Sequence, residues 1–141
     1  MITVRRYAND IPGRLNMLDS GKIVGFVITT DYDRAREFYE EKLALQFVSV
    51  DQFALVMKSG GNMIRISKAA NFTPLVGTVL GWEVKDLEAI VAWLKERGVV
   101  FEKYPFVEDP EGIWTAPSGD KVAWFKDPDG NVLSVSEHRE D

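Results

Sequence analysis

The first half of the chain alternates between short β-type runs and one helical segment. Residues 21–30 (GKIVGFVITT) are rich in β-branched side chains, which is typical of a buried strand. Asp31 is a candidate N-cap, and from Tyr32 to Leu43 apolar side chains recur at helical spacing between charged ones. Three more strands are predicted, separated by turns with Asp51 and the Ser59-Gly60-Gly61 group, at 45–50, 53–58 and 62–68.

The second half repeats this order. A strand is predicted over 77–84, Asp86 stands where an N-cap is needed, and 87–97 is an amphipathic helix with Gly98 as its stop. The turn Asp127-Pro128-Asp129-Gly130 has proline and glycine where a tight turn favours them. The remaining strands are predicted at 99–107, 121–126 and 131–136.

The two halves align residue by residue, which indicates a duplicated unit. Asp31 matches Asp86 and Phe38 matches Trp93, both at a shift of 55, and Arg65 falls opposite Ser134 at a shift of 69. The difference is a longer loop around residues 108–120 in the second half. Strand, helix and three strands, repeated, predict an α+β fold with helices on one face of an antiparallel-rich sheet. The other face is then a cup, a partner surface, or both.

Strand alternation divides the side chains between these two faces. One set is apolar and is expected to pack under the helices, against Phe38 and Trp93; it comprises Ile64, Ile66, Leu80, Trp82, Val84, Leu133 and Val135. The opposite set is mixed and is expected to line the open face; it comprises Met63, Arg65, Ser67, Val79, Gly81, Glu83, Val132, Ser134 and Ser136.

Composition sets limits on location and partners. The chain has 141 residues, 45% hydrophobic and 28% charged, with a net charge of −5 and no cysteine. These values are typical of one globular domain and argue against nucleic acid as a partner, since phosphate binding needs clustered basic residues. No apolar run is long enough to span a bilayer, and residues 1–20 lack the apolar core of a secretory signal, so we expect no membrane contact and a cytoplasmic location.

Three stretches in order resemble the vicinal oxygen chelate superfamily, which includes glyoxalases, bleomycin resistance proteins and extradiol dioxygenases. They are TTDYDRAREFYEEKLALQF from Thr29, WEVKDLEAIVAWLKERGV from Trp82 and FKDPDGNVLSVSEH from Phe125. The resemblance covers a single domain at 21–138 and implies two tandem βαβββ modules, about 21–70 and 77–138. Their mixed sheet would form an open cup with the helices on its outer face. Residues 1–20 remain an N-terminal arm, which either pairs as an edge strand through Ile2 to Tyr7 or wraps a partner.

The resemblance also indicates where metal-binding relatives carry their ligands. Those places correspond here to Val24, Arg65, Val79 and Ser134, which offer no imidazole or carboxylate. We therefore expect no metal and no other cofactor. The only histidine, His138, lies in a charged tail and is interpreted as a solvated residue.

The open face is also a candidate binding cup for a small molecule. Its candidate ligand-binding residues combine aromatic and apolar side chains with a few polar groups: Phe26, Phe53, Leu55, Met63, Arg65, Glu83, Trp114, Trp124 and Ser134. The competing interpretation is that the aromatic residues belong to a core or dimer interface, with Arg65 and Glu83 as an internal ion pair. Glu83 is also the candidate acid–base residue, provided that burial raises its pKa.

Three functions are compatible with these residues. The first is a metal-independent binding protein that resembles the bleomycin-resistance type and sequesters a small molecule in an aromatic crevice of a homodimer. The second is a glyoxalase-like lyase, epimerase or dioxygenase with a non-standard site. The third is a protein-interaction module that buries its open face against another protein.

Overall fold

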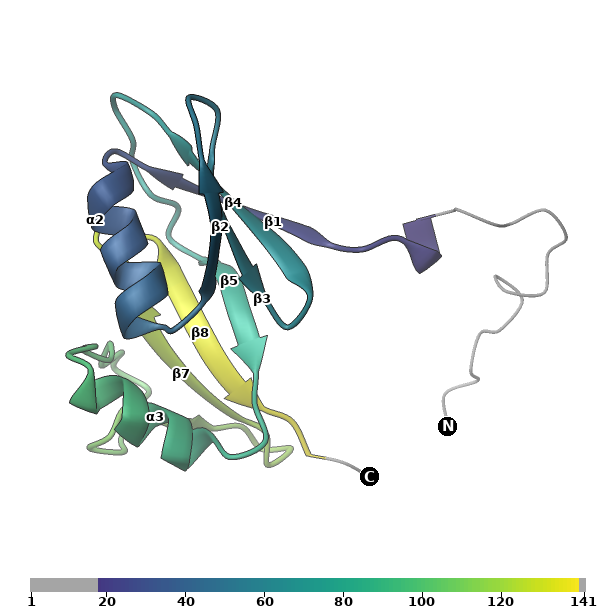
Figure 1. Cartoon of the computed structure of the whole chain (residues 1–141). Helices are drawn as coiled ribbons and strands as arrows, with labels where there is room; N and C mark the ends of the chain where they lie inside the picture. Colours follow the sequence, from purple (N-terminus) through teal and green to yellow (C-terminus); the bar gives the residue numbers. More distant parts are fainter. Residues whose placement is uncertain (1–17, 140–141) are drawn as a thin grey trace, which may run out of the picture.

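The structure, a computed structural model, describes residues 18–139. Two modules of the same order follow one another, after a short 3-10 turn η1 (Leu18–Ser20). Figure 1 shows the two helices on one side and the strands of both modules on the other. The predicted α+β fold of two tandem βαβββ modules is confirmed. The expectations for residues 1–17 lie outside the described residues.

The first module contains one four-stranded mixed sheet. Its strands are β1 (Val24–Thr29), β2 (Gln46–Val50), β3 (Leu55–Ser59) and β4 (Asn62–Lys68), in the order β1-β4-β3-β2. Strand β1 runs parallel to β4, and the other neighbours are antiparallel. The bounds of β4 match those predicted from the sequence.

The second module repeats this topology with the order β5-β8-β7-β6. Its strands are β5 (Thr78–Glu83), β6 (Trp114–Thr115), β7 (Lys121–Lys126) and β8 (Val132–Glu137). The predicted strand at 99–107 is wrong: only Phe101 forms a bridge there, to Phe125, and the sheet edge is completed by Trp114–Thr115. The segment instead turns at Tyr104, whose carbonyl accepts a bond from the backbone N–H of Val107.

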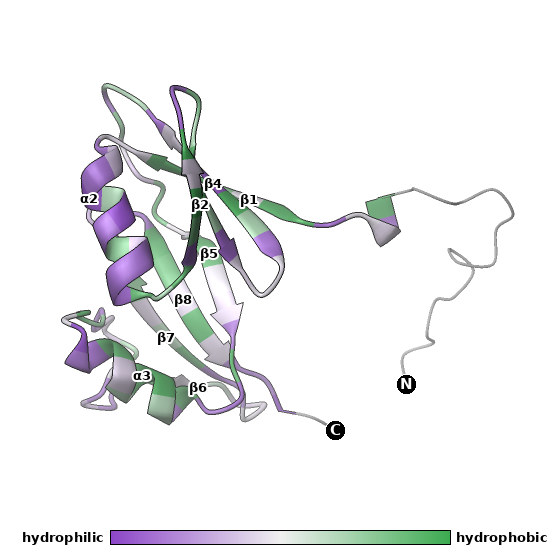
Figure 2. Cartoon of the chain, viewed as in Figure 1, coloured by the Kyte–Doolittle hydropathy of each residue, from purple (hydrophilic) through white to green (hydrophobic). Residues whose placement is uncertain are grey.

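Each module carries one helix with the expected cap. Helix α2 (Tyr32–Arg36) continues as the π-helix η2 (Glu37–Lys42), and α3 spans Leu87–Glu96. The carboxylates of Asp31 and Asp86 accept bonds from the third residue beyond, as the sequence predicts. Figure 2 shows hydrophilic residues on the outer side of α2 and apolar residues alternating along the strands beneath.

The helices end differently in the two modules. Gly98 ends α3 with a left-handed φ of 89°, whereas Ala44 ends η2 with a φ of 61°. The interval from N-cap to left-handed residue is one residue longer in the first module (Asp31 to Ala44) than in the second (Asp86 to Gly98). The wider π turn accommodates this extra residue, because the backbone N–H of Leu43 bonds to the carbonyl five residues back at Phe38.

The hydrophobic core is continuous across the two modules. The rings of Phe38 and Phe125 lie 6.4 Å apart, and Phe125 also contacts Phe101 at 5.5 Å. The predicted core face is confirmed for Ile64, Ile66, Leu133 and Val135, which are almost fully buried. Trp93 is a correction: it does not pack in the core like its counterpart Phe38 but is 36% exposed on α3.

Polar side chains of the second module's turn bind the first module. Asp129 accepts bonds from the hydroxyls of Thr29 and Thr30 and pairs with Arg34 at 2.8 Å. Asp127 accepts from the Tyr39 hydroxyl at 2.6 Å. We call these contacts of Asp127 and Asp129 the inter-module latch. They fix the turn beside the end of β1, and this turn belongs to the third stretch that resembles the superfamily. Within residues 18–139 no helix has both the length and the apolar character needed to cross a membrane.

Candidate functional site

The open face of the first sheet brings three predicted residues together. Phe26 and Arg65 are direct register partners in β1 and β4, and Val24 pairs with Met63 one alternation earlier. Phe26 is 65% exposed, which is unusual for a phenylalanine on a sheet face. Hydrogen bonds from the backbone N–H groups of Phe53 and Ala54 lower the pKa of the Asp51 carboxyl, and the positive charge of Arg65 lowers it further.

The open face of the second sheet carries a cluster of four aromatic rings. Trp124 on β7 pairs with Ser134 on β8, and the indole of Trp114 lies 6.2 Å from that of Trp124. Tyr104 and Phe106 stack on one another at 5.6 Å, and each meets the Trp124 ring edge to face. Centroid separations of this size are those of favourable aromatic contacts. We call these four residues the aromatic cluster.

A pocket opens beside the aromatic cluster. It has a volume of about 250 Å³ and is lined by Thr78, Tyr104, Phe106, Trp124 and Val132, with Val76 and Gly77 at one side. Gly81 keeps the neighbouring Ser134 uncovered, because a Cβ at this glycine would lie 2.5 Å from the serine Oγ. The face therefore combines flat apolar walls with a hydroxyl in the adjoining register position.

Sequence reasoning misses two members of the aromatic cluster. Tyr104 and Phe106 lie in the segment predicted as a strand, which assigns their side chains to a ladder that does not form. Pro105 between them is the available signal, since proline removes a ladder donor and is confined to edges and bulges. Interpreting the segment as a loop would have removed the incorrect strand assignment of both rings.

Two predicted site residues lie elsewhere. Leu55 is a correction: it pairs with Ile66 and is fully buried in the core, not on the open face. Phe53 precedes β3 in a turn closed by Asp51, where strand parity no longer applies, and its side chain is 68% exposed. Arg65 and Glu83 lie in different sheets, and no ion pair joins them.

Glu83 and His138, titratable residues at the end of β5 and just after β8, are both exposed. Glu83 is exposed at the end of β5 and therefore lacks the burial that would activate its carboxylate. His138 is about half exposed; its Nε2 lies 3.0 Å from Ser136 Oγ, but its Nδ1 is 3.8 Å from Asp120 Oδ2, longer than a hydrogen bond. Asp120 instead accepts the backbone N–H of Arg139 at 2.7 Å.

The residues at the metal positions of the resembling family do not fit a metal ion. Arg65 cannot lose its proton, Val24 has no lone pair, and Ser134 is a neutral hydroxyl. Val79 departs further, since it lies at a bulge between Thr78 and Leu80 and packs partly against the core. Across residues 18–139 no three His, Cys, Asp or Glu side chains gather as metal ligands.

The duplicated βαβββ unit, with helices on one side and an exposed sheet face on the other, places the chain among α+β proteins built from two tandem modules. Residues 21–135 match the family model of the Glyoxalase/Bleomycin resistance protein/Dioxygenase superfamily, and the chain belongs to this superfamily. No protein with a curated description matches the chain.

Solved structures agree on the fold. A putative glyoxalase family protein from Bacillus anthracis has a TM-score of 0.68 at 19% identity, covering 85% of this chain and 96% of that one. A glyoxalase/bleomycin resistance protein/dioxygenase from Alicyclobacillus acidocaldarius has a TM-score of 0.70 at 16% identity, with 86% and 94% covered. A superfamily member from Sphaerobacter thermophilus has 0.67 at 22% identity, with 84% and 98% covered.

Proposed function

We propose that this chain is a metal-independent binding protein of the bleomycin-resistance type, which sequesters a planar aromatic molecule on the open face of the second sheet. The observation that carries the proposal is the aromatic cluster beside its pocket. The metal positions Val24, Arg65, Val79 and Ser134 carry no group that suits a metal ion. Such pockets, with apolar walls and few polar groups, are the usual form of a small-molecule site.

Binding by this face needs no chemical step. Trp124 supports the pocket, and Tyr104 and Phe106 supply ring edges and faces against which a planar ligand can stack. The contacts among the four rings already fix their orientation, so less side-chain entropy is lost when a ligand binds. Ser134 is the register partner of Trp124, and its hydroxyl adds a donor or acceptor next to the pocket.

The same proposal includes a homodimer that completes the crevice. The open face of the first sheet leaves large apolar side chains uncovered, including Phe26 at 65% and Met63 at 38%. Arg65 supplies a positive charge there, while Glu83 supplies a negative one on the open face of the second sheet. In a two-fold dimer the first sheet of each copy can face the second sheet of the other. A second copy would then cover the apolar surface and bring the opposite charges together.

Thermal shift with matched variants tests the binding proposal. A planar aromatic compound should raise the melting temperature of the wild type and of Val100→Ala, an exposed apolar control, by mass action. The shift should disappear in Trp124→Ala. Ni²⁺, Zn²⁺, Fe²⁺ and Mn²⁺ should give none. A metal-dependent shift, or equal ligand shifts in Trp124→Ala and Val100→Ala, would contradict the proposal, and the former would favour a glyoxalase-like enzyme.

Light scattering after size exclusion tests the dimer. The wild type should have twice the chain mass of 15.9 kDa, and Phe26→Asp should reduce it to one chain mass. Val100→Asp introduces the same charge at an exposed apolar position outside the strands and should leave the dimer intact. A monomeric wild type would remove the crevice between copies from the proposal and leave the single-chain pocket to be judged by the thermal shifts.

A further inference from the structure

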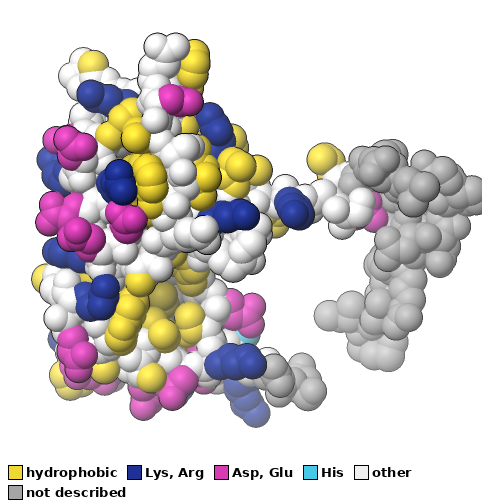
Figure 3. Space-filling model, viewed as in Figure 1, with side chains coloured by type: hydrophobic (Ala, Val, Ile, Leu, Met, Phe, Trp, Pro, Cys, Tyr) yellow, Lys and Arg dark blue, Asp and Glu magenta, His cyan; other side chains and the backbone are white. Residues whose placement is uncertain are grey.

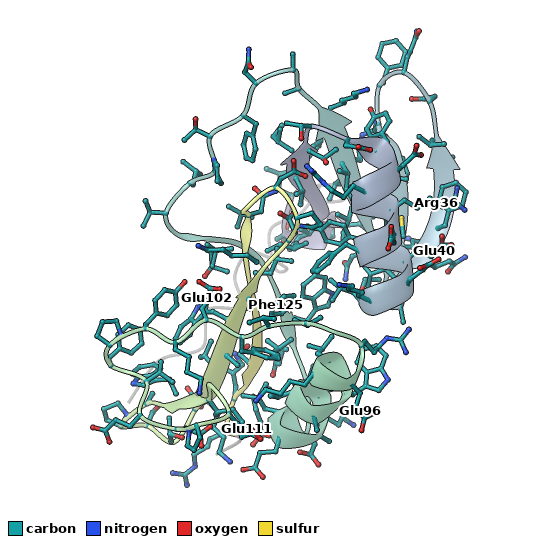
Figure 4. The ribbon with its side chains drawn as sticks, turned by 90° about the vertical axis from the view of Figure 1, so that its left-hand side faces the viewer. Arg36, Glu40, Glu96, Glu102, Glu111 and Phe125 are labelled. Atoms are coloured by element: carbon teal, nitrogen blue, oxygen red, sulfur yellow. The ribbon has the colours of Figure 1, made fainter. Side chains whose placement is uncertain are left out.

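A second, larger cavity lies on the helix side of the molecule, away from the open face. It has a volume of about 350 Å³ between the end of η2 and α3, and its walls include Leu45, Ser59, Trp82, Val84, Ile90 and Trp93. In Figure 4, Phe125, which also lines it, lies between the two helices, and Figure 3 shows hydrophobic side chains reaching the surface there. The volume lies in the range of small-molecule sites.

The internal repeat explains why this cavity exists. The duplication places Leu94 where the first module has Tyr39, since both carbonyls accept the bond that closes their helix, from Val99 and Leu45 respectively. Tyr39 is fully buried beneath the helix of the first module and donates a hydrogen bond to Asp127. Leu94 is shorter and has no hydroxyl, so the equivalent space under α3 is not filled.

The turn of the first module that faces this cavity also has smaller side chains than its counterpart in the second module. Asp127 and Asp129 in the second module's turn reach across to the first module, whereas the equivalent turn of the first module is Ser59-Gly60-Gly61. A Cβ added to either of its two glycines would have no atom beyond the adjoining residues within 4 Å, so a side chain there would meet open space. Where the turn of the second module forms the polar inter-module latch with the first module, the equivalent place between the first module's turn and α3 holds an apolar cavity.

Trp93 contributes to the same difference. Its counterpart Phe38 is buried in the core, but Trp93 turns outward and lies under the guanidinium of Arg97, 4.6 Å from the ring centroid. Arg97 in turn donates through Nε to the carbonyl of Lys42 at 2.9 Å. Trp93 is therefore held at the edge of the cavity, where it lines the space but does not occupy it.

We propose that this cavity is a binding site for a small, flat, uncharged aromatic molecule. None of its lining side chains is ionisable, so a charged ligand would lose its hydration without compensation. Two indoles, those of Trp82 and Trp93, offer surfaces for stacking. Ser59 Oγ accepts the Trp82 Nε1–H at 2.9 Å, which leaves the serine's own hydrogen to donate to one acceptor on the ligand. The site is separate from the open face and does not depend on the function proposed for it.

Titration of the full chain with N-phenyl-1-naphthylamine, an uncharged probe that fluoresces in apolar surroundings, tests the site. Saturable binding is expected, weakened about tenfold or more in Trp93→Ala, which removes a wall, and in Ile90→Phe, which fills the cavity. Val100→Ala, at an exposed position outside the lining of both pockets, should bind the probe like the wild type. In a Trp124→Ala background, which removes binding on the open face, saturable binding and its loss in Trp93→Ala should persist. Circular dichroism and the unfolding midpoint verify that each variant folds.

A measurement on the wild type gives an answer that no folding defect can obscure. In a nitrogen-15 NMR titration, the indole N–H signals of Trp82 and Trp93 should shift with the probe, independently of any change at Trp114 and Trp124 on the open face. Absence of saturable binding, or shifts confined to Trp114 and Trp124 with affinity lost only in Trp124→Ala, would overturn the proposal. The second pattern would instead support the open face as the site of an aromatic ligand.

Discussion

The phenol of Tyr39 donates a 2.6 Å hydrogen bond to the carboxylate of Asp127, and both groups are buried between the two modules. Burial raises the pKa of Tyr39 well above its ordinary value, and the charge of Asp127 raises it further, so the phenol keeps the proton that it donates. Asp127 also accepts from the backbone N–H groups of Asp129 and Asn131 and from the Asn131 side chain. A turn of the second module is thereby fixed to the helix of the first.

Tyr39→Phe should reduce the free energy of unfolding by about 1–3 kcal/mol, because Asp127 loses a donor while it remains buried. Tyr32→Phe is a matched control, since the Tyr32 hydroxyl is buried without a hydrogen-bond partner in the described part of the chain. That change should be neutral or stabilising. Urea unfolding measures the free energy of unfolding of both variants. Equal decreases in the two variants would mean that the Tyr39–Asp127 hydrogen bond adds no stability.

Asp129 should make the protein sensitive to acid. Burial opposes ionisation of its carboxyl, but hydrogen bonds from Thr29 and Thr30 and the charge of Arg34 together outweigh burial and lower its pKa. A carboxyl with a pKa lower in the folded than in the unfolded state adds stability above the unfolded pKa of about 3.9 and loses it as the pH falls through the folded value. The free energy of unfolding should therefore fall below about pH 4.

The variant Asp129→Asn separates this group from the other carboxyls. It should be less stable than the wild type at neutral pH, and the difference should narrow in acid, where Asp129 is protonated in both states. Urea unfolding between about pH 2.5 and 7 measures both curves. A constant gap across this range would assign the loss to altered packing and not to the charge.

Ala44→Gly should stabilise the protein by about 1 kcal/mol. Ala44 has a φ of 61°, a left-handed conformation that costs an L-residue with a Cβ about 1–2 kcal/mol. Gly98, which ends the helix of the second module, already avoids this cost. Ala92→Gly, on the exposed side of α3, should instead destabilise by roughly 0.5–1 kcal/mol. Thermal unfolding of the two variants should therefore shift in opposite directions.

Leu55→Ala should be strongly destabilising, by about 2–5 kcal/mol, because it leaves a cavity at a fully buried core position. Phe53→Ala, two residues earlier, removes a larger side chain that is 68% exposed and should change stability by less than about 0.5 kcal/mol. Similar effects of the two variants would show that residues 53–55 share one environment, as the sequence pattern alone indicates.

The difference between these two residues shows where sequence reasoning reaches its limit. Caps at Asp31 and Asp86, the turn at Gly130 and the bounds of β4 follow from local chemistry and can be predicted. Alternation places Leu55 on the wrong face because the segment around it is almost uniformly apolar and carries little information on parity. Analogy with Phe38 places Trp93 in the core, but its exposure depends on Arg97 and on the space left by a small turn.

The aromatic cluster is only half predictable for a related reason. Trp114 and Trp124 are among the predicted ligand-binding residues, whereas the strand predicted at 99–107 hides Tyr104 and Phe106. Their position depends on how a loop crosses the sheet, which is a tertiary property. The arrangement of the modules likewise depends on the contacts of the inter-module latch, although the turn that carries it can be recognised from its residues.

The continuous core has a consequence for how the chain folds. Phe38 and Phe125, and the bond from Thr29 to Asp129 between residues 100 positions apart, join the two repeats into one cooperative unit. Contacts this distant in sequence close late and slow the search for the native state. One core is shared by the two repeats, so an isolated half would expose part of its apolar surface and should stay unfolded, and the whole chain should unfold in one transition. The ancestral single repeat would then have needed a second copy of itself in order to fold.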